Sequence, residues 1–181
     1  MSVIRKTIDL KKILRLNKIK RNKIGLVPTM GTLHEGHLSL VNEALENCDE
    51  VWVSIFVNPI QFNDPKDFKL YPSDPNSDIK KIHSISKDIN LFIPESVREI
   101  YPVDPISEKF DFGILDKVME GAHRPGHFNG VATVLKKLFE IFEPNHVFFG
   151  EKDYQQTLIV SKLIDNLFPK ISLMVCPTIR N

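Results

Sequence analysis

The sequence predicts an α/β fold, namely a Rossmann-like, doubly wound parallel sheet with helices on both faces. Short apolar runs alternate with stretches of helical apolar spacing, and this repeated order favours right-handed crossovers between parallel strands. Clusters of polar residues follow several of the apolar runs, at what would be the carboxyl ends of the strands. Ligands bind at those ends in sheets of this kind, so the sequence predicts a binding site there.

The predicted elements follow the apolar pattern along the chain. In the opening helix, Leu10, Ile13, Leu14 and Leu16 are expected on one side, and the lysines form a solvated face. The expected strands are 24–27, ending at a proline, 51–57, 91–93, 147–149 and 173–176, and the expected helices are 9–20, 38–45, 76–87, 131–142 and 158–167.

The middle of the chain is rich in proline and is expected to form loops that cover the site. Seven prolines lie between Pro59 and Pro105. Asp74 suits an N-cap and Pro75 the first helical position, which supports the helix that follows them. We assign no element to residues 95–111.

Composition limits the partners and the location of the protein. A net charge of +1, from 24 Lys and Arg against 23 Asp and Glu, creates no field that would recruit nucleic acid or an anionic membrane. Cys48 and Cys176 lie far apart and indicate neither a disulfide framework nor a CxxC metal site. No apolar run approaches the roughly 20 residues of a membrane span. We therefore expect a cytoplasmic domain covering residues 1–181.

Two histidines stand three residues apart where the first predicted strand runs into a helix, in the stretch PTMGTLHEGH at residues 28–37. A helix N-terminus offers free N–H groups and the positive end of a dipole, so His34 and His37 could add donors to a phosphate site. A cap paired with a core-edge histidine is an equally good structural interpretation. A metal pair is weaker, because no third ligand lies nearby in the sequence.

Uncharged amides follow the second predicted strand. Asn58 and Gln61 lie between bulky apolar residues, and a carboxamide can bind a hydroxyl or carboxylate of a small ligand without carrying charge. An Asn-Pro turn with an exposed glutamine is the structural alternative. Arg124, in the glycine-rich stretch GAHRPGHFNG, could neutralise a phosphate or pair with an acid, and the residues favour neither.

The stretch FGEKDYQQ, at residues 149–156, follows the fourth predicted strand. Gly150 permits close approach of a ligand, Lys152 suits polyphosphate, and Asp153 can cap the next helix and accept from ribose hydroxyls. Gln156 lies three residues into that helix. The chain has neither a P-loop nor a GxGxxG fingerprint, so phosphate binding would use a different motif.

Together these motifs resemble the pantothenate synthetase (pantoate-beta-alanine ligase) family. The resemblance runs in order from about Ile24 to Arg180 and includes PTMG with HEGH, FVNPIQF at 56–62, Tyr71-Pro72, Arg124-Pro125 and FGEKDYQQ. The HxGH element alone indicates only the wider nucleotidyltransferase superfamily, which includes class I aminoacyl-tRNA synthetases. The loop at residues 56–62, which carries Asn58 and Gln61 and which we call the amide loop, and the FGEKDYQQ run are much more specific.

The resemblance implies a two-step ligation. Pantoate would attack the α-phosphorus of ATP to give pantoyl adenylate and pyrophosphate, and the amine of β-alanine would then displace AMP. Catalysis would depend on alignment and on stabilising charge on the phosphates, helped by Mg²⁺. The family also implies a homodimer.

The resemblance also assigns roles to individual residues. His34, His37 and Lys152 would be catalytic at the phosphates. ATP would contact Met30, His34, His37, Gly150, Lys152, Asp153 and Ile179, whereas pantoate would contact Asn58, Gln61, Tyr71, Arg124 and Gln156. Asp78 aligns with an acid near a metal site in relatives, and Ser77 replaces another acid, so the metal ligands stay open.

Family chains continue past Arg180 into a Ser-Ser-Arg loop and a small C-terminal domain. We therefore expect residues 1–181 to be an N-terminal nucleotide- and pantoate-binding domain, with poor turnover on its own. Two alternatives stay open. One is another HxGH adenylyltransferase, which would want cationic residues where this chain has Asn58 and Gln61. The other is a non-catalytic nucleotide-binding module.

Overall fold

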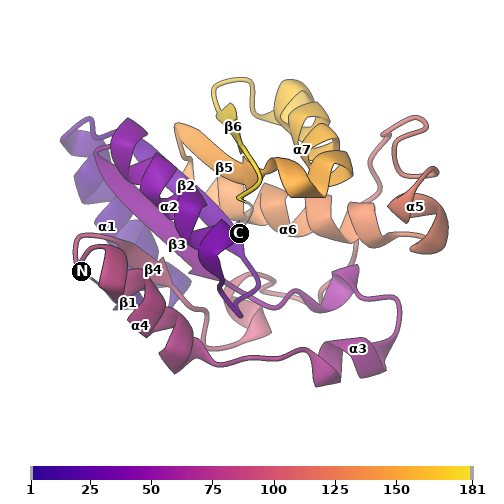
Figure 1. Ribbon diagram of the computed structural model, residues 1–181, viewed down its shortest axis with the longest axis horizontal. Coiled ribbons are helices and arrows are strands. Elements are labelled where there is room, and N and C mark those ends of the chain that lie inside the picture. Colours follow the sequence, from indigo (N-terminus) through magenta and orange to yellow (C-terminus); the bar gives the residue numbers. More distant parts are fainter. Residues whose placement is uncertain (1, 180–181) are drawn as a thin grey trace.

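The computed structural model describes residues 2–179, and within them the strands form one parallel sheet with the order β1-β4-β3-β2-β5-β6 (Figure 1). Arg180, where the sequence resemblance ends, lies outside the described residues. The strands are β1 (Val3–Ile4), β2 (Ile24–Thr29), β3 (Glu50–Ile55), β4 (Asn90–Phe92), β5 (His146–Gly150) and β6 (Ser172–Cys176). The predicted doubly wound α/β fold is therefore confirmed.

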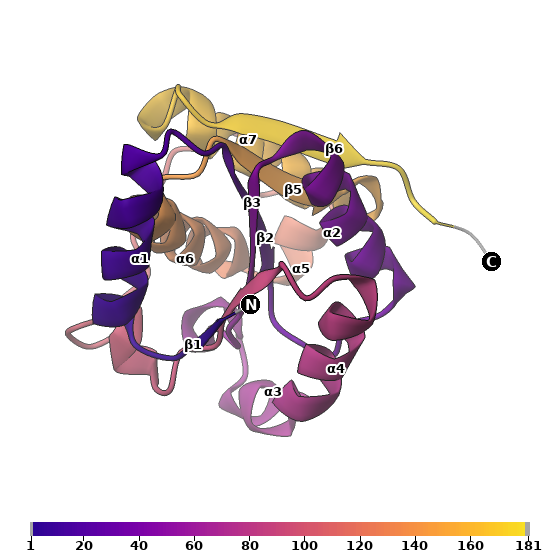
Figure 2. The same cartoon turned by 90° about the vertical axis from the view of Figure 1, so that its left-hand side faces the viewer.

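Helices cover both faces of the sheet, as Figure 2 shows with the sheet seen from its edge. The core against one face contains residues of α1 (Thr7–Ile19), α6 (His127–Phe142) and α7 (Tyr154–Leu167). The other face packs against α2 (Glu35–Asn47) and α4 (Pro75–Ile85). Two shorter helices, α3 (Pro65–Leu70) and α5 (Glu120–His123), lie in the connections.

Several elements differ from the prediction, and the strand expected at 51–57 ends at Ile55. The sequence shows no apolar run long enough to predict β1, because it is a two-residue edge strand. The strand predicted to end at a proline continues through Pro28 to Thr29. Leu16 is 61% exposed whereas Leu10 and Leu14 are buried, because two residues turn a helix by about 200° and carry the side chain away from the core.

Strands β2 and β5 separate towards their carboxyl ends. Among the described residues, they pair at Gly25 and Leu26 of β2 alone, whereas β2 pairs with β3 along its whole length. The connections that leave β2 and β5 therefore diverge and leave a gap at the centre of the carboxyl edge of the sheet. This is the switch point at which a doubly wound sheet binds ligands.

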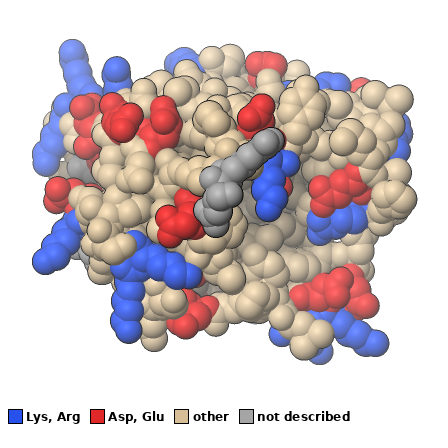
Figure 3. All heavy atoms as spheres, viewed as in Figure 1, with Lys and Arg blue, Asp and Glu red and all other residues tan. Residues whose placement is uncertain are grey.

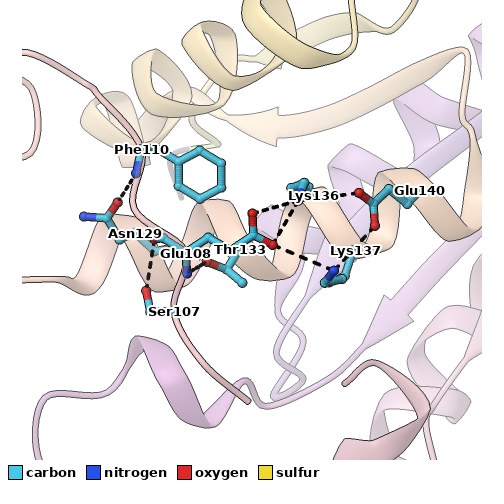
Figure 4. Close-up of polar contacts among 8 residues, drawn as sticks. All are labelled: Ser107, Glu108, Phe110, Asn129, Thr133, Lys136, Lys137 and Glu140. Carbon is cyan, nitrogen blue, oxygen red and sulfur yellow. Dashed lines mark hydrogen bonds and ion pairs between the residues drawn. The ribbon is translucent and has the colours of Figure 1, made fainter. Parts of the chain in front are cut away.

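The segment left unassigned by the sequence contains one short 3-10 helix, Val97–Glu99, and its later part, residues 107–110, runs along α6 without regular structure (Figure 4). The Glu108 N–H donates to Thr133 Oγ1 at 2.9 Å, and the Phe110 N–H donates to Asn129 Oδ1 at 2.8 Å. Lys136 Nζ donates to both carboxylate oxygens of Glu108. We call residues 107–110 the strap, since successive turns of α6 hold it.

Charged side chains of both signs are interspersed over the face drawn in Figure 3. Within residues 2–179, none of the helices combines the length and apolar character needed to cross a membrane. Asp74 caps α4 as expected, because its Oδ1 accepts the N–H of Ser77 at 3.0 Å.

Candidate active site

Two adjoining cavities open where β2 and β5 separate. The inner cavity has a volume of about 190 Å³, below the roughly 300 Å³ at which drug-sized pockets begin, and the outer one reaches about 440 Å³. His37, Gly150 and Asp153 line both cavities. The geometry therefore provides a small compartment and a larger one with a shared wall.

The inner cavity has apolar walls and few polar groups. Its apolar lining comes largely from α6, including Val131, Val134 and Leu138, and from Phe56 after β3. The polar side chains on its wall include three residues from the predicted pantoate set, namely Gln61, Tyr71 and Gln156. Met30 also lines this cavity. Such a compartment suits a small, largely apolar molecule that carries a few oxygen atoms.

The outer cavity collects the residues predicted to bind ATP. It is lined by His34, His37, Gly150, Lys152, Asp153 and Ile179, together with Glu35, Gly36, Leu40, Pro177 and Thr178. These residues come from the start of α2, the end of β5 and the segment after β6. The topology thus brings together three segments that lie far apart in the sequence.

His34 and His37 form the cap of α2, and this arrangement sets the tautomer of each neutral ring. His34 is the N-cap, and its Nδ1 accepts the N–H of Gly36 at 3.1 Å. His37 Nδ1 accepts the N–H of His34 at 3.3 Å, so the two residues complete a capping box. A ring nitrogen that accepts carries no proton, so each neutral ring holds its proton on Nε2.

The structural and phosphate interpretations of the histidines are therefore compatible. The rings lie with centroids 4.1 Å apart, and both line the outer cavity. Burial, followed by the nearby His34, lowers the pKa of His37 to about 4. At neutral pH His37 is thus an uncharged Nε2–H donor rather than a cation.

The turn before His34 is held by α4. Gly31 and Thr32 have positive φ angles of 89° and 55°, and the N–H groups of Thr32 and Leu33 both point at Asp78. Asp78 Oδ2 and Oδ1 accept them at 2.9 and 2.7 Å, while Lys81 donates to the Leu33 carbonyl at 2.6 Å. Consecutive N–H groups in such a conformation form a nest for an anion, which here is the Asp78 carboxylate.

This geometry does not fit Asp78 as a metal ligand. The residue is 2% exposed and each carboxylate oxygen already accepts a backbone N–H. In the part of the chain that the structure describes, no group of three or more His, Cys, Asp or Glu side chains is placed to hold a metal ion. Asp78 acts instead on the shape of the turn that precedes the histidines.

Asn58 lies behind the inner cavity, not on its wall. It is 1% exposed, and its Nδ2 donates to Gln61 Oε1 and to the Gly130 carbonyl, both at 3.1 Å. Neither Asn58 nor Gln61, which is 8% exposed, matches the alternative of an exposed turn. The expectation that Asn58 lines the pocket is corrected, because its amide is used to hold the neighbouring glutamine.

Arg124 also lies off the walls of both cavities. It sits at the end of α5 and pairs with Glu120 one turn earlier. Of the two interpretations that its sequence context left open, the structure shows the ion pair with an acid. The prediction that it lines the pocket is corrected, because the short helix α5 directs the charge to Glu120.

Gly150 and Asp153 both reach the shared wall. A Cβ on Gly150 would meet nothing within 4 Å, which leaves open space for a ligand beside the backbone. Asp153 occupies the N-cap position of α7, yet its side chain makes no capping hydrogen bond there. The predicted capping role is therefore wrong in this structure, and the carboxylate is free to face the cavity.

Sequence reasoning missed several residues that hold this site. Tyr101 and His127 are buried against the amide loop, and Gln155 uses its side chain to bind the loop before α5. Tyr101 lies 43 residues from its partner, and His127 lies 66 residues from its own. No local pattern marks such contacts, because only the packing of α6 against the loop creates them.

The parallel α/β sheet and the HxGH turn at the end of β2 define a Rossmann-like α/β protein with an HxGH motif. The comparisons with known proteins then specify the family. The sequence profile of the Pantoate-beta-alanine ligase family matches residues 2–181. The chain belongs to this family.

Similar proteins include the pantothenate synthetase of Flavobacterium psychrophilum, 47% identical over 99% of this chain and 64% of that protein. The pantothenate synthetase of Christiangramia forsetii is 50% identical over 91% of this chain and 59% of its own length. The chain thus spans about three fifths of the length of these curated relatives.

Solved structures agree with the fold throughout the chain. Pantothenate synthetase from Thermus thermophilus matches with a TM-score of 0.90 and 39% identity, covering 100% of this chain and 63% of that one. The pantoate-beta-alanine ligase of Francisella tularensis, complexed with beta-gamma ATP and beta-alanine, matches with a TM-score of 0.88 and 41% identity. That match covers 100% of this chain and 68% of the other.

Proposed function

We propose that this chain carries the site in which pantoate is activated by ATP and then joined to β-alanine. The observation that carries the proposal is the meeting of the two cavities at His37. The inner cavity suits a small acid with hydroxyl groups, and the outer one suits the nucleotide. A carboxylate in the first would face the α-phosphorus of ATP in the second.

In the first step, a carboxylate oxygen of pantoate attacks the α-phosphorus and pyrophosphate leaves. The Nε2–H groups of His34 and His37 donate to the phosphate oxygens on which charge develops, and Lys152 adds a positive charge. In the second step, the amine of β-alanine attacks the acyl carbon, forms the amide bond and releases AMP. Neither step needs a protein nucleophile, so holding the reactants in line is the main task of the site.

Gln61, Gln156 and Tyr71 would hold pantoate, and Gly150, Asp153 and Ile179 would contact the nucleoside part of ATP. We propose that Mg²⁺ enters with the phosphates of ATP, because this ion keeps several waters and binds largely through substrate phosphates. Met30, at the turn that joins β2 to α2, would offer its backbone N–H to the phosphates. These roles follow the cavity walls on which the residues lie, except that of Met30, which lines the inner cavity and whose role follows from the family resemblance.

We also propose that residues 1–181 form the nucleotide- and pantoate-binding domain of such a ligase. The solved complex of the Francisella tularensis relative with beta-gamma ATP and beta-alanine supports the substrate assignment. A homodimer stays a prediction that rests on the resemblance, and a cytoplasmic location stays one that rests on composition.

The first step is tested by isotope exchange between pyrophosphate and ATP. We expect exchange that requires pantoate and does not require β-alanine, since the adenylate forms before the amine is used. Exchange without pantoate would contradict the proposal, and so would no exchange at saturating substrates.

Two variants test the division into cavities. Gln61→Ala should lower kcat/KM for pantoate by about a hundredfold while leaving ATP affinity within about twofold, because it removes a donor from the inner cavity. Lys152→Ala should mainly weaken the binding of ATP and pyrophosphate. Lys170→Ala, an exposed lysine that lies on neither cavity wall, is the matched control. A loss of ATP affinity in Gln61→Ala would show that the cavities are misassigned.

A further inference from the structure

Tyr101 is a buried tyrosine that the proposed reaction does not use. It is 3% exposed, and its hydroxyl donates to Asn58 Oδ1 at 2.9 Å. Tyr101 is not on the wall of either cavity. Tyr101 is nevertheless linked to Gln61 through a single residue, because Asn58 Nδ2 donates to the glutamine Oε1.

The backbone of α6 sets the direction of this hydrogen-bond chain. The Gly130 carbonyl can only accept, so the Asn58 side chain must turn its Nδ2 towards it, at 3.1 Å. Asn58 Oδ1 then faces Tyr101, which must donate. Burial raises the pKa of the Tyr101 hydroxyl well above its ordinary value, so the donor keeps its proton at any physiological pH.

The same chain fixes the orientation of Gln61. The second Nδ2 hydrogen of Asn58 goes to Gln61 Oε1 at 3.1 Å, so the glutamine Nε2 points the other way, towards Met30 Sδ at 2.9 Å. The reverse orientation would bring two amide NH₂ groups together. A thioether sulfur is a weak acceptor, so the Gln61 NH₂ group keeps its capacity to donate to a ligand.

The main chain of Gln61 is held as firmly as its side chain. His127 Nδ1 lies 2.8 Å from the Gln61 carbonyl, which can only accept, so this histidine carries its proton on Nδ1. A Cβ on Gly130 would lie 2.5 Å from the Ile60 carbonyl oxygen, so α6 packs directly on the loop backbone. Little freedom is left for the glutamine to adapt to a different ligand.

We propose that Tyr101 is a positioning residue that, through Asn58, locks Gln61 as a hydrogen-bond donor, so that the inner cavity selects a ligand with an acceptor oxygen at that point. The inference rests on the proposed function, in which this ligand is pantoate. Hydroxyl and carboxylate oxygens both satisfy the requirement, whereas a group that can only donate does not.

The test removes one hydroxyl. Tyr101→Phe should lower kcat/KM for pantoate by about tenfold in the pyrophosphate exchange reaction, because Asn58 Oδ1 loses its partner and the chain loosens. ATP affinity should change by less than twofold. Tyr154→Phe makes the same change at a residue that is 58% exposed, and it should leave both values unaltered.

A double-mutant cycle separates positioning from a general loss of structure. In a Gln61→Ala background, Tyr101→Phe should have no further effect on kcat/KM for pantoate, because the residue through which it acts is gone. An additive tenfold loss would overturn the inference, as would equal losses for pantoate and ATP in the single variant.

The two proposals fail in different ways. If Gln61→Ala leaves kcat/KM for pantoate unchanged, the assignment of the inner cavity is wrong. If Gln61→Ala lowers it and Tyr101→Phe does not, the cavity assignment stands and the positioning role of Tyr101 is rejected. Thermal unfolding of each variant, measured beside the wild type, checks that the compared proteins are folded.

Discussion

Two faces of α6 hold neighbouring segments by different means. The pocket face, with His127 and Gly130, packs on the amide loop through buried, neutral hydrogen bonds. The strap face, with Asn129, Thr133 and Lys136, holds the strap at the surface and adds an ion pair with Glu108. The side chains of that pair are 23% and 37% exposed.

The difference shows which contacts can set direction at a binding site. On the pocket face, each buried polar group has a defined donor or acceptor, so a reversed amide would leave unpaired groups with no water to satisfy them. On the strap face Thr133 is buried, but the side chains of the Glu108–Lys136 ion pair are partly exposed, so water can replace a lost partner there and salt screens the charges. The pocket face therefore fixes the orientation of an amide side chain, whereas the strap face only holds the strap against α6.

The largest effect is expected on the pocket face itself. Gly130→Ala should lower the free energy of unfolding by about 3 kcal/mol, because the new Cβ would overlap the backbone at Ile60 and Gln61. Urea denaturation measures this loss. Gly150→Ala is the control, since its Cβ would meet open space, and it should stay within about 0.5 kcal/mol of wild type. A stable Gly130→Ala variant would show that the two segments are not tightly packed.

Asp78 is a buried acid of α4, which packs on the face of the sheet opposite α6, so it tests whether burial makes a contact insensitive to salt even when one partner is charged. Asp78→Asn should lower the free energy of unfolding by about 2 kcal/mol, because the new NH₂ group would face a backbone N–H of Thr32 or Leu33. This loss should be the same at low and high salt, as measured by urea denaturation in each. If salt abolished it, the contact would belong with the exposed ion pairs and not with the pocket face.

The next prediction concerns the dependence of the free energy of unfolding on pH. The pKa of His37 is lowered from 6.5 to about 4, so between these values the unfolded chain binds a proton that the folded chain does not. Stability should therefore fall as the pH drops through this window, by about 1–2 kcal/mol between pH 7 and pH 5. His34, Asp78, Lys152 and Lys81 all act on this pKa, and burial is the largest cause.

His37→Gln removes the titrating ring while keeping a side chain suited to the capping box. Its urea-denaturation stability should depend less on pH over the same range than that of the wild type. Identical pH dependence in the two proteins would mean that the pKa of His37 is the same in the folded and the unfolded chain. NMR should also find the proton of His34 and His37 on Nε2 at neutral pH, and that of His127 on Nδ1.

The smallest effect is expected on the strap face. Glu108→Gln should lower the free energy of unfolding by less than about 1 kcal/mol, because Glu108 and Lys136 are partly exposed. The loss should shrink at about 1 M salt, where charges are screened over about 3 Å. The matched control is Glu151→Gln, an exposed acid on the short turn before α7. A large loss that salt does not reduce would mean that the two faces work in the same way.

Local sequence patterns are enough to specify the order of most strands and helices, the position of the HxGH turn and the family. These features are local: apolar spacing marks each element, Asp74 marks the start of α4, and short motifs follow the strands. The same local pattern predicted which residues would gather at the carboxyl edge, and the cavity walls contain His34, His37, Gln61, Lys152 and Gln156.

Which polar residues face the cavities and which lie behind them depends on how distant segments pack together. Asn58 and Gln61 are both amides in one loop, yet packing by Gly130 and Tyr101 turns one into a support and leaves the other at the wall. Likewise, Asp78 serves the turn before the histidines because α4 folds back across the sheet edge. The direction of a hydrogen bond depends on partners distant in sequence, and no local pattern records them.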